Sequence, residues 1–163
     1  MSNTIRMHPV AGFVAWMAVT FVAAAAGAAA SVDAAPFYAA LVRPSWAPPS
    51  GLFGPVWTLL YALMGVAVWW AWRHGASRRV LGLYVVQLVA NALWSWLFFA
   101  WHRGALAFVD ILVLWCLIVA TAVGLWRVRP LSGALLLPYL AWVTFASALN
   151  WAVWHLNPAV LGA

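Results

Sequence analysis

Five long stretches of the chain are almost free of charged residues. Four lack any Asp, Glu, Lys or Arg, and they are Val10–Ala30, Gly54–Trp72, Val80–Trp101 and Leu131–Leu156. The fifth, Ala105–Trp126, carries a single acid, Asp110. Since a helix rises about 1.5 Å per residue, about 20 residues cross the hydrocarbon core, and each stretch is long enough. The pattern predicts membrane helices over residues 10–30, 55–73, 80–101, 105–126 and 131–156.

Within these stretches the apolar residues are continuous rather than alternating, which favours helices over the strands of a β-barrel. Composition points to the membrane as well, because 68% of the residues are hydrophobic and 6% are charged. In a soluble domain about 45–50% of the residues are apolar and about 25% are charged. We therefore expect one domain over residues 1–163, an all-α membrane protein. It is a five-transmembrane-helix bundle with a long structured loop between helices 1 and 2.

The first apolar stretch also has features of a cleavable signal peptide. Arg6 precedes it, and the small residues Ala28-Ala29-Ala30-Ser31 end it. The run is longer than the ~7–15 residues of a typical signal-peptide core, so we interpret it as the first membrane helix.

All eight basic residues are arginines, and the net charge is +6. They lie singly or in pairs at the predicted helix ends, as topology requires, so we do not expect nucleic-acid binding. The side of the N-terminus holds Arg6, Arg73, Arg78, Arg79, Arg127 and Arg129, and the opposite side holds Arg43 and Arg103. This bias predicts a cytoplasmic N-terminus in an inner membrane, or a periplasmic one in an outer membrane.

The loop over residues 31–54 is rich in proline and aromatic residues. Its prolines are Pro36, Pro44, Pro48 and Pro49, with Pro55 directly after it. Each fixes φ and stiffens the chain. Phe37, Tyr38 and Trp46 make the loop too apolar for a free linker. We expect a short helix over Pro36–Val42 and a lid packed on the helix ends; the alternative is a loop resting among lipid headgroups.

Polar and aromatic side chains gather in the loop-side half of the predicted bundle. Gln87, Asn91 and Ser95 recur every four residues on the third helix, as Trp142, Ala146 and Asn150 do on the fifth. Both faces should turn inward, because polar groups facing lipid would stay unsatisfied. Trp57, Tyr61 and Trp94 lie at similar depth. The pattern has two interpretations, interhelical hydrogen bonding and a cavity for a large planar ligand.

Few residues suit conventional catalysis. Asp110, the one acid inside a span, is a functional candidate, but it also lies near enough to the interface to hydrate or to pair with Arg103. We expect the only cysteine, Cys116, to be a small buried residue. No metal-ligand spacing, phosphate loop or catalytic triad occurs in the sequence. We therefore expect neither a conventional enzyme nor an obligatory cofactor.

A set of motifs from residue 37 to residue 150 resembles a known family. They are Phe37-Tyr38, Arg43-Pro44-Ser45-Trp46-Ala47-Pro48-Pro49, Pro55-Val56-Trp57 with Tyr61 and Gly65, then Gln87, Asn91, Trp94 and Asp110, then Pro138-Tyr139 with Trp142, Ala146 and Asn150. In order and spacing the chain resembles a bacterial member of the tryptophan-rich sensory protein or translocator protein family (TspO/MBR), also called the peripheral benzodiazepine receptor family.

The resemblance implies a homodimeric five-helix bundle whose first loop closes a pocket. It also implies binding of porphyrins such as protoporphyrin IX, of isoquinoline-carboxamide drugs and, in animal members, of cholesterol. The ligand-lining residues carried over by position are Tyr38, Trp57, Asn91, Trp142 and Ala146. We add Tyr61, Trp94 and Asn150 on depth and facing, Trp46 from the loop motif, and Asp110, Gln87 and Arg43 as polar candidates. Leu149–His155 lacks the Tyr and Arg of the animal cholesterol motif, so tight cholesterol binding is not expected.

The expected function is that of a membrane receptor or carrier that binds porphyrins and senses or regulates tetrapyrrole handling. The macrocycle would lie between Trp57 and Trp142, with its propionates near Arg43 or Arg103, and membrane lipid is the other expected partner. One alternative is a light-dependent porphyrin-degrading enzyme. Another is a transporter of tetrapyrrole or sterol-like molecules, against which the lack of repeated halves counts.

Overall fold

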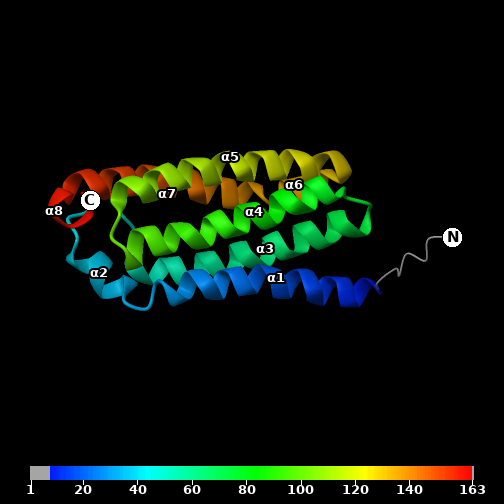
Figure 1. Cartoon of the computed structure of the whole chain (residues 1–163), viewed down its shortest axis with the longest axis horizontal. Helices are drawn as coiled ribbons and strands as arrows, with labels where there is room; N and C mark the ends of the chain where they lie inside the picture. The colour runs from blue at the N-terminus through cyan, green and yellow to red at the C-terminus, as the bar shows by residue number, and fades with distance from the viewer. Residues whose placement is uncertain (1–7, 163) are drawn as a thin grey trace.

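Five long helices lie side by side in an elongated bundle in the computed structural model, which describes residues 8–162 (Figure 1). They are α1 (Pro9–Ala29), α3 (Phe53–Arg73), α4 (Arg78–Ser95), α5 (Gly104–Val128) and α7 (Leu137–Leu156). The described residues contain five segments long and apolar enough to cross a membrane, namely Pro9–Ala29, Ser50–Arg73, Arg78–Ala100, Gly104–Val128 and Pro130–Leu156. The predicted fold class, an all-α five-helix membrane bundle, is confirmed.

The helices form a closed ring around a buried centre. α1 packs against α3 and α4, α5 packs against α4 and α7, and α3 meets α7 and the short helix α6 (Pro130–Ala134). Met64, Tyr84, Leu88 and Tyr139 fill the middle of the ring. Gly65 lets α3 approach α1 closely, because a Cβ there would overlap the Met17 side chain.

The fifth predicted helix, over residues 131–156, is interrupted. α6 ends at Ala134 and α7 begins at Leu137. Pro138 explains the break, because proline lacks an N–H and its ring would clash with the carbonyl four residues earlier, that of Ala134.

The third predicted helix, over residues 80–101, also changes before its end. The segment Trp96–Ala100 (η2) forms a π-helical turn directly after α4. The Trp101 N–H donates to the carbonyl of Trp96, five residues earlier, at 2.8 Å. The wider turn changes the direction of the side chains that follow, and Phe98 is buried as a result.

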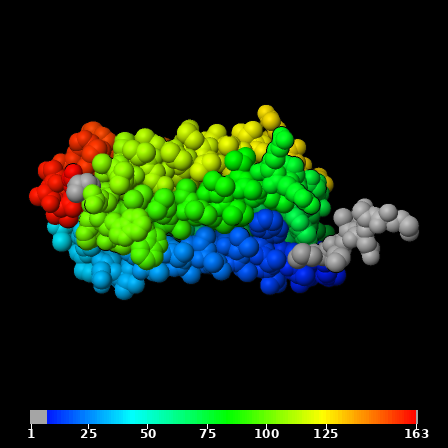
Figure 2. Space-filling view, viewed as in Figure 1, coloured from blue at the N-terminus to red at the C-terminus, as the bar shows by residue number. Residues whose placement is uncertain are grey.

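The loop between α1 and α3 contains the helix α2 (Ala34–Ala40) and a 3-10 turn, η1 (Ser50–Leu52). The short helix predicted at Pro36–Val42 therefore exists, with both ends two residues earlier. Figure 2 shows the loop covering one end of the bundle, beside the C-terminal residues. Asn157 attaches it there, since its Oδ1 accepts from the Val42 N–H at 2.9 Å and its Nδ2 donates to the Val42 carbonyl at 2.8 Å. The short helix α8 (Pro158–Leu161) follows.

The outer surface of the bundle is apolar along its length, as lipid contact requires. Val22 and Val89 are more than 60% exposed. The prediction that Cys116 is buried is wrong, because the thiol lies exposed on α5. A small apolar side chain is tolerated on a surface whose solvent is lipid, so the sequence could not tell this face from the core.

Candidate ligand-binding cavity

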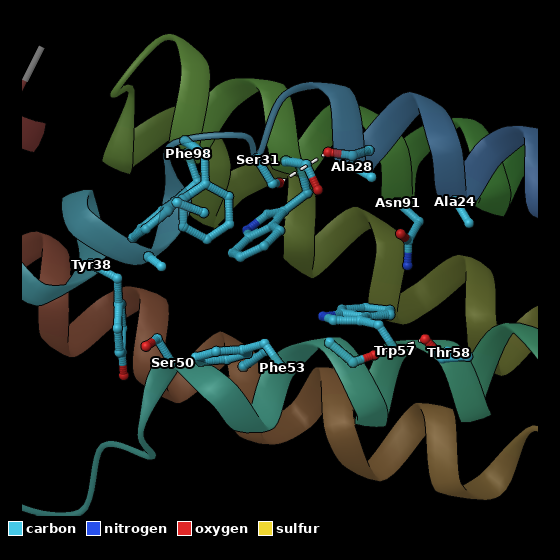
Figure 3. Close-up of a pocket in the computed structure, with 18 of the residues that line it drawn as sticks. Ala24, Ala28, Ser31, Tyr38, Ser50, Phe53, Trp57, Thr58, Asn91 and Phe98 are labelled. Atoms are coloured by element: carbon cyan, nitrogen blue, oxygen red, sulfur yellow. Dashed lines mark hydrogen bonds between the residues drawn. The ribbon is translucent and has the colours of Figure 1, made fainter.

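A cavity of about 620 Å³ lies in the loop-side half of the bundle (Figure 3). Ligand cavities in proteins typically measure about 300–1,000 Å³. Aromatic rings make up much of its wall, and they belong to Phe53, Trp57, Trp94, Phe98 and Trp142. Its volume and its aromatic lining suit a large, flat, mainly apolar molecule.

Helical spacing places the aromatic side chains on inward faces. Trp57 and Tyr61 are four residues apart on α3, and their ring centroids are 5.7 Å apart. Trp142 and Ala146 are likewise four apart on α7, and both line the cavity. The small Ala146 side chain leaves room beside the Trp142 ring.

The α1 wall consists largely of small residues. Ala24, Ala28 and Gly27 line the cavity there, and a Cβ at Gly27 would lie 3.3 Å from the Ser95 hydroxyl. Across the cavity stands Thr58 of α3, and Figure 3 shows the two helices on opposite sides. Ala28 and Thr58 are also exposed at the surface, so the cavity opens between α1 and α3.

A chain of hydrogen bonds forms the floor of the cavity. The Tyr61 hydroxyl donates to Asn91 Oδ1 at 2.6 Å, and Asn91 Nδ2 donates to the Tyr139 hydroxyl at 2.6 Å. Tyr139 in turn donates to Gln87 Oε1 at 2.9 Å. Both ends of the Asn91 amide are therefore used to join α3, α4 and α7.

Asn150 makes a second polar connection closer to the loop. Its Oδ1 accepts from Trp94 Nε1 at 2.9 Å, and its Nδ2 donates to the Gly104 carbonyl at 3.3 Å. The side chain thus joins α4, α7 and the start of α5. The interhelical interpretation of the polar stripes is correct for Asn91 and Asn150, and the same residues also line the cavity.

Trp142 differs from these residues because its polar atom is free. Its Nε1 is buried and finds no hydrogen-bond partner among residues 8–162. Figure 3 shows Trp57 projecting from α3 into the same space, with its ring nitrogen on the edge toward the cavity interior. A buried donor without a partner costs free energy, so this position is less well satisfied than Asn91 or Asn150.

Tyr38 and Arg43 belong to the loop that covers the cavity. Tyr38 lines the cavity and is buried, and its hydroxyl donates to the Pro48 carbonyl at 3.1 Å. The Arg43 guanidinium lies 4.8 Å from the centre of the Tyr38 ring. Burial raises the pKa of the Tyr38 hydroxyl, and the nearby Arg43 opposes part of that rise. The loop therefore places a positive charge beside the cavity.

The sequence pattern of the TspO/MBR family matches residues 13–155. The chain belongs to the TspO/MBR family. It is 42% identical over 149 residues to Protein CrtK of Rhodobacter capsulatus, a match that covers 86% of this chain and 92% of the relative.

Two further relatives of this TspO/MBR chain come from distant organisms. Tryptophan-rich protein TspO of Chlorobaculum tepidum is 41% identical over 126 residues, covering 75% of this chain and 80% of the relative. The human Translocator protein is 40% identical over 126 residues, covering 74% of this chain and 75% of the relative.

The structure brings eight of the nine proposed ligand-binding residues of this TspO/MBR protein to one cavity. They are Tyr38, Trp57, Tyr61, Asn91, Trp94, Trp142, Ala146 and Asn150. The ninth, Trp46, lies outside it. Trp46 is 49% exposed, and its ring centroid lies 5.8 Å from that of Phe145 on α7.

The three polar candidates also lie outside the cavity wall. Gln87 is buried beneath the floor, where it supports Tyr139. Arg43 lies above the roof, over Tyr38. Asp110 is half-buried on α5, and its Oδ2 has no hydrogen-bond partner in the described chain.

Sequence reasoning missed several cavity residues of this TspO/MBR protein. On η2 they are Phe98 and Phe99, and on α7 they are Leu149 and Val153. The helical period that identified Asn91, Ser95 and Asn150 continues through these positions, so extending the stripes toward the loop could have found them. The small residues of α1 gave no such signal, because they equally suit close helix packing.

Proposed function

We propose that this protein binds a porphyrin such as protoporphyrin IX in the cavity and acts as a membrane receptor or carrier for tetrapyrroles. One observation carries the proposal. The indoles of Trp57 and Trp142, from two different helices, line the same cavity of about 620 Å³. Flat aromatic side chains give a planar macrocycle large contact areas at little entropic cost.

Polar groups around the cavity suit the edges of such a ligand. Trp142 contributes its indole ring to the cavity wall, whereas its Nε1 is covered by protein atoms. Porphyrin propionates are carboxylates, and Arg43 lies beside the roof formed by Tyr38. A guanidinium pairs well with a carboxylate, so Arg43 is the proposed partner of a propionate.

The shape of the cavity favours a binding site over an open passage. Its wall comes from the loop-side halves of α1, α3, α4 and α7. Below it, Met64, Leu88 and Tyr139 fill the bundle centre and are each at most 2% exposed.

The test is a titration of the purified protein in detergent with protoporphyrin IX, followed by the porphyrin absorbance band. The double variant Trp57→Phe with Trp142→Phe should bind about thirtyfold more weakly, since the two indole contacts contribute of the order of 1 kcal/mol each. The matched control replaces Trp101 and Trp126, which are exposed at the bundle ends, by Phe. Wild-type affinity in the Trp57 and Trp142 variant would place the porphyrin elsewhere.

A further inference from the structure

A second cavity, of about 440 Å³, lies at the surface of the loop end. It is bordered by the end of α1, the start of α2 and the η2 turn. Val32 and Phe99 line both cavities, so the two are neighbours separated by these side chains. None of the proposed porphyrin contacts, Trp57, Trp142 and Arg43, lines this second cavity.

Four aromatic side chains, those of Phe37, Trp96, Phe99 and His102, form part of its wall. Phe37 and His102 stack with centroids 4.3 Å apart and an interplanar angle of 19°. Phe99 meets Phe37 edge-on, at 6.4 Å and 81°. Trp96 completes the wall, and its Nε1 donates to the Ala26 carbonyl at 3.1 Å, which fixes the orientation of the indole.

His102 takes up a backbone conformation that side chains other than glycine rarely adopt. Its φ is +54°, the one positive value for a non-glycine residue in the described chain. Such conformations persist where the surroundings enforce them, and they are enriched at functional sites. Here the conformation directs the imidazole onto Phe37 at the mouth of the cavity.

Asp33 adds a carboxylate to this aromatic wall. It is one of two acids in a chain of net charge +6. It occupies the N-cap position of α2, yet its side chain makes no capping hydrogen bond. The exposed carboxylate is therefore not used to hold the helix, and it lines the second cavity.

We propose that the second cavity binds an alkylammonium group, the cationic part of an ethanolamine or choline headgroup. Aromatic faces attract such cations through their quadrupoles, and a carboxylate adds a counter-charge. The site lies at the end of the membrane-spanning helices, where headgroups are found. Arg103, next in the chain to His102, is exposed and offers a counter-charge for a headgroup phosphate.

The test measures binding of short-chain phosphatidylcholine and phosphatidylglycerol to the full chain in an uncharged detergent, by native mass spectrometry. The wild type should retain the choline lipid in preference to the glycerol lipid. Asp33→Asn and Trp96→Leu should each weaken choline-lipid binding by roughly fivefold. Asp110→Asn removes the same charge outside this cavity and should leave the binding unchanged.

Free phosphocholine, added as a competitor, distinguishes the source of the group. Displacement of the lipid at equal concentration indicates that the headgroup alone is recognised. No displacement indicates that the acyl chains are required as well. Both results are compatible with the ammonium site. Equal retention of the two lipids by the wild type, or unchanged binding by Asp33→Asn, would overturn it. Porphyrin affinity, measured on the same samples, should not change, so failure here is separable from failure of the porphyrin proposal.

Discussion

Asn91 and Tyr139 use their polar atoms on each other and on neighbouring helices, whereas Trp142 keeps its donor free. The polar residues around the cavity thus have two different roles. Side chains whose hydrogen bonds are complete should contribute mainly to stability. Side chains whose rings line the cavity, such as Trp57 and Trp142, should contribute mainly to ligand affinity.

The variant Tyr139→Phe tests this division. It leaves Asn91 Nδ2 and Gln87 Oε1 without their shared partner, which should destabilise the bundle by about 1 kcal/mol. Because Tyr139 lies beneath the cavity, porphyrin affinity should stay close to wild type. Thermal unfolding in detergent and a porphyrin titration measure the two effects. Trp57→Phe is the matched contrast, and it should lower porphyrin affinity while leaving the unfolding midpoint nearly unchanged. If both variants lowered affinity equally, the division between stabilising and ligand-binding residues would be wrong.

Arg43→Gln tests the proposed role of the charge above Tyr38. Loss of the guanidinium should weaken binding of protoporphyrin IX by about three- to tenfold, because a propionate loses its charged partner. Binding of the dimethyl ester, which carries no carboxylate, should not change. Arg103→Gln, at the same end of the bundle, serves as the matched control. A similar loss of affinity for acid and ester would show that Arg43 acts through the loop structure and not through its charge.

At the scale of helices, Gly133 and Gly82 allow the effect of close packing to be distinguished from the effect of helix propensity. A Cβ at Gly133 would lie 2.6 Å from the Trp126 Cβ and 2.8 Å from the Ala122 carbonyl oxygen. These atoms cannot move aside, so Gly133→Ala should destabilise the contact of α5 with α6 by about 1–3 kcal/mol. Gly82 on α4 has no atom of residues 8–162 within 4 Å of such a Cβ. Gly82→Ala should therefore stabilise by about 0.5 kcal/mol, measured as the unfolding midpoint.

Asn157 connects the loop to the end of the bundle, and its removal should loosen the loop. Asn157→Ala breaks the two hydrogen bonds to Val42 and a third to the Val153 carbonyl at 2.8 Å. We expect faster amide hydrogen exchange over residues 31–54 and faster porphyrin dissociation. Val160→Ala, an exposed change on α8, should alter neither. Unchanged exchange in the loop after Asn157→Ala would show that apolar contacts alone hold it.

The helices were predictable because an uninterrupted apolar run of about 20 residues has few other stable structures in a membrane. The inward faces of α4 and α7 were predictable because Asn91 and Asn150 would be unsatisfied in lipid. The break before α7 was not predicted, although Pro138 is visible in the sequence, because membrane helices often tolerate proline. The placement of Trp46 against Phe145, outside the cavity wall, depends on the path of the loop, which local sequence does not determine.

At the scale of the whole molecule, charge and shape together predict an orientation in the membrane. Arg6 lies outside the described residues. The other arginines separate to the two ends of the bundle, with Arg73, Arg78, Arg79, Arg127 and Arg129 at the end where α1 begins and Arg43 and Arg103 at the loop end. Arginine is retained on the cytoplasmic side, so the loop and both cavities should face away from the cytoplasm of an inner membrane.

A cysteine-labelling experiment tests this orientation in whole cells. Cys116 is the only native thiol, so Cys116→Ala gives a background on which single cysteines can be added. Ser45→Cys in the loop and Ser77→Cys between α3 and α4 form a matched pair, since both replace a serine outside the predicted spans. A membrane-impermeant maleimide should label Ser45→Cys in intact cells and Ser77→Cys only after lysis, because positive charge resists translocation. The reverse pattern would place the loop in the cytoplasm, and the cavity would then receive its porphyrin from that side.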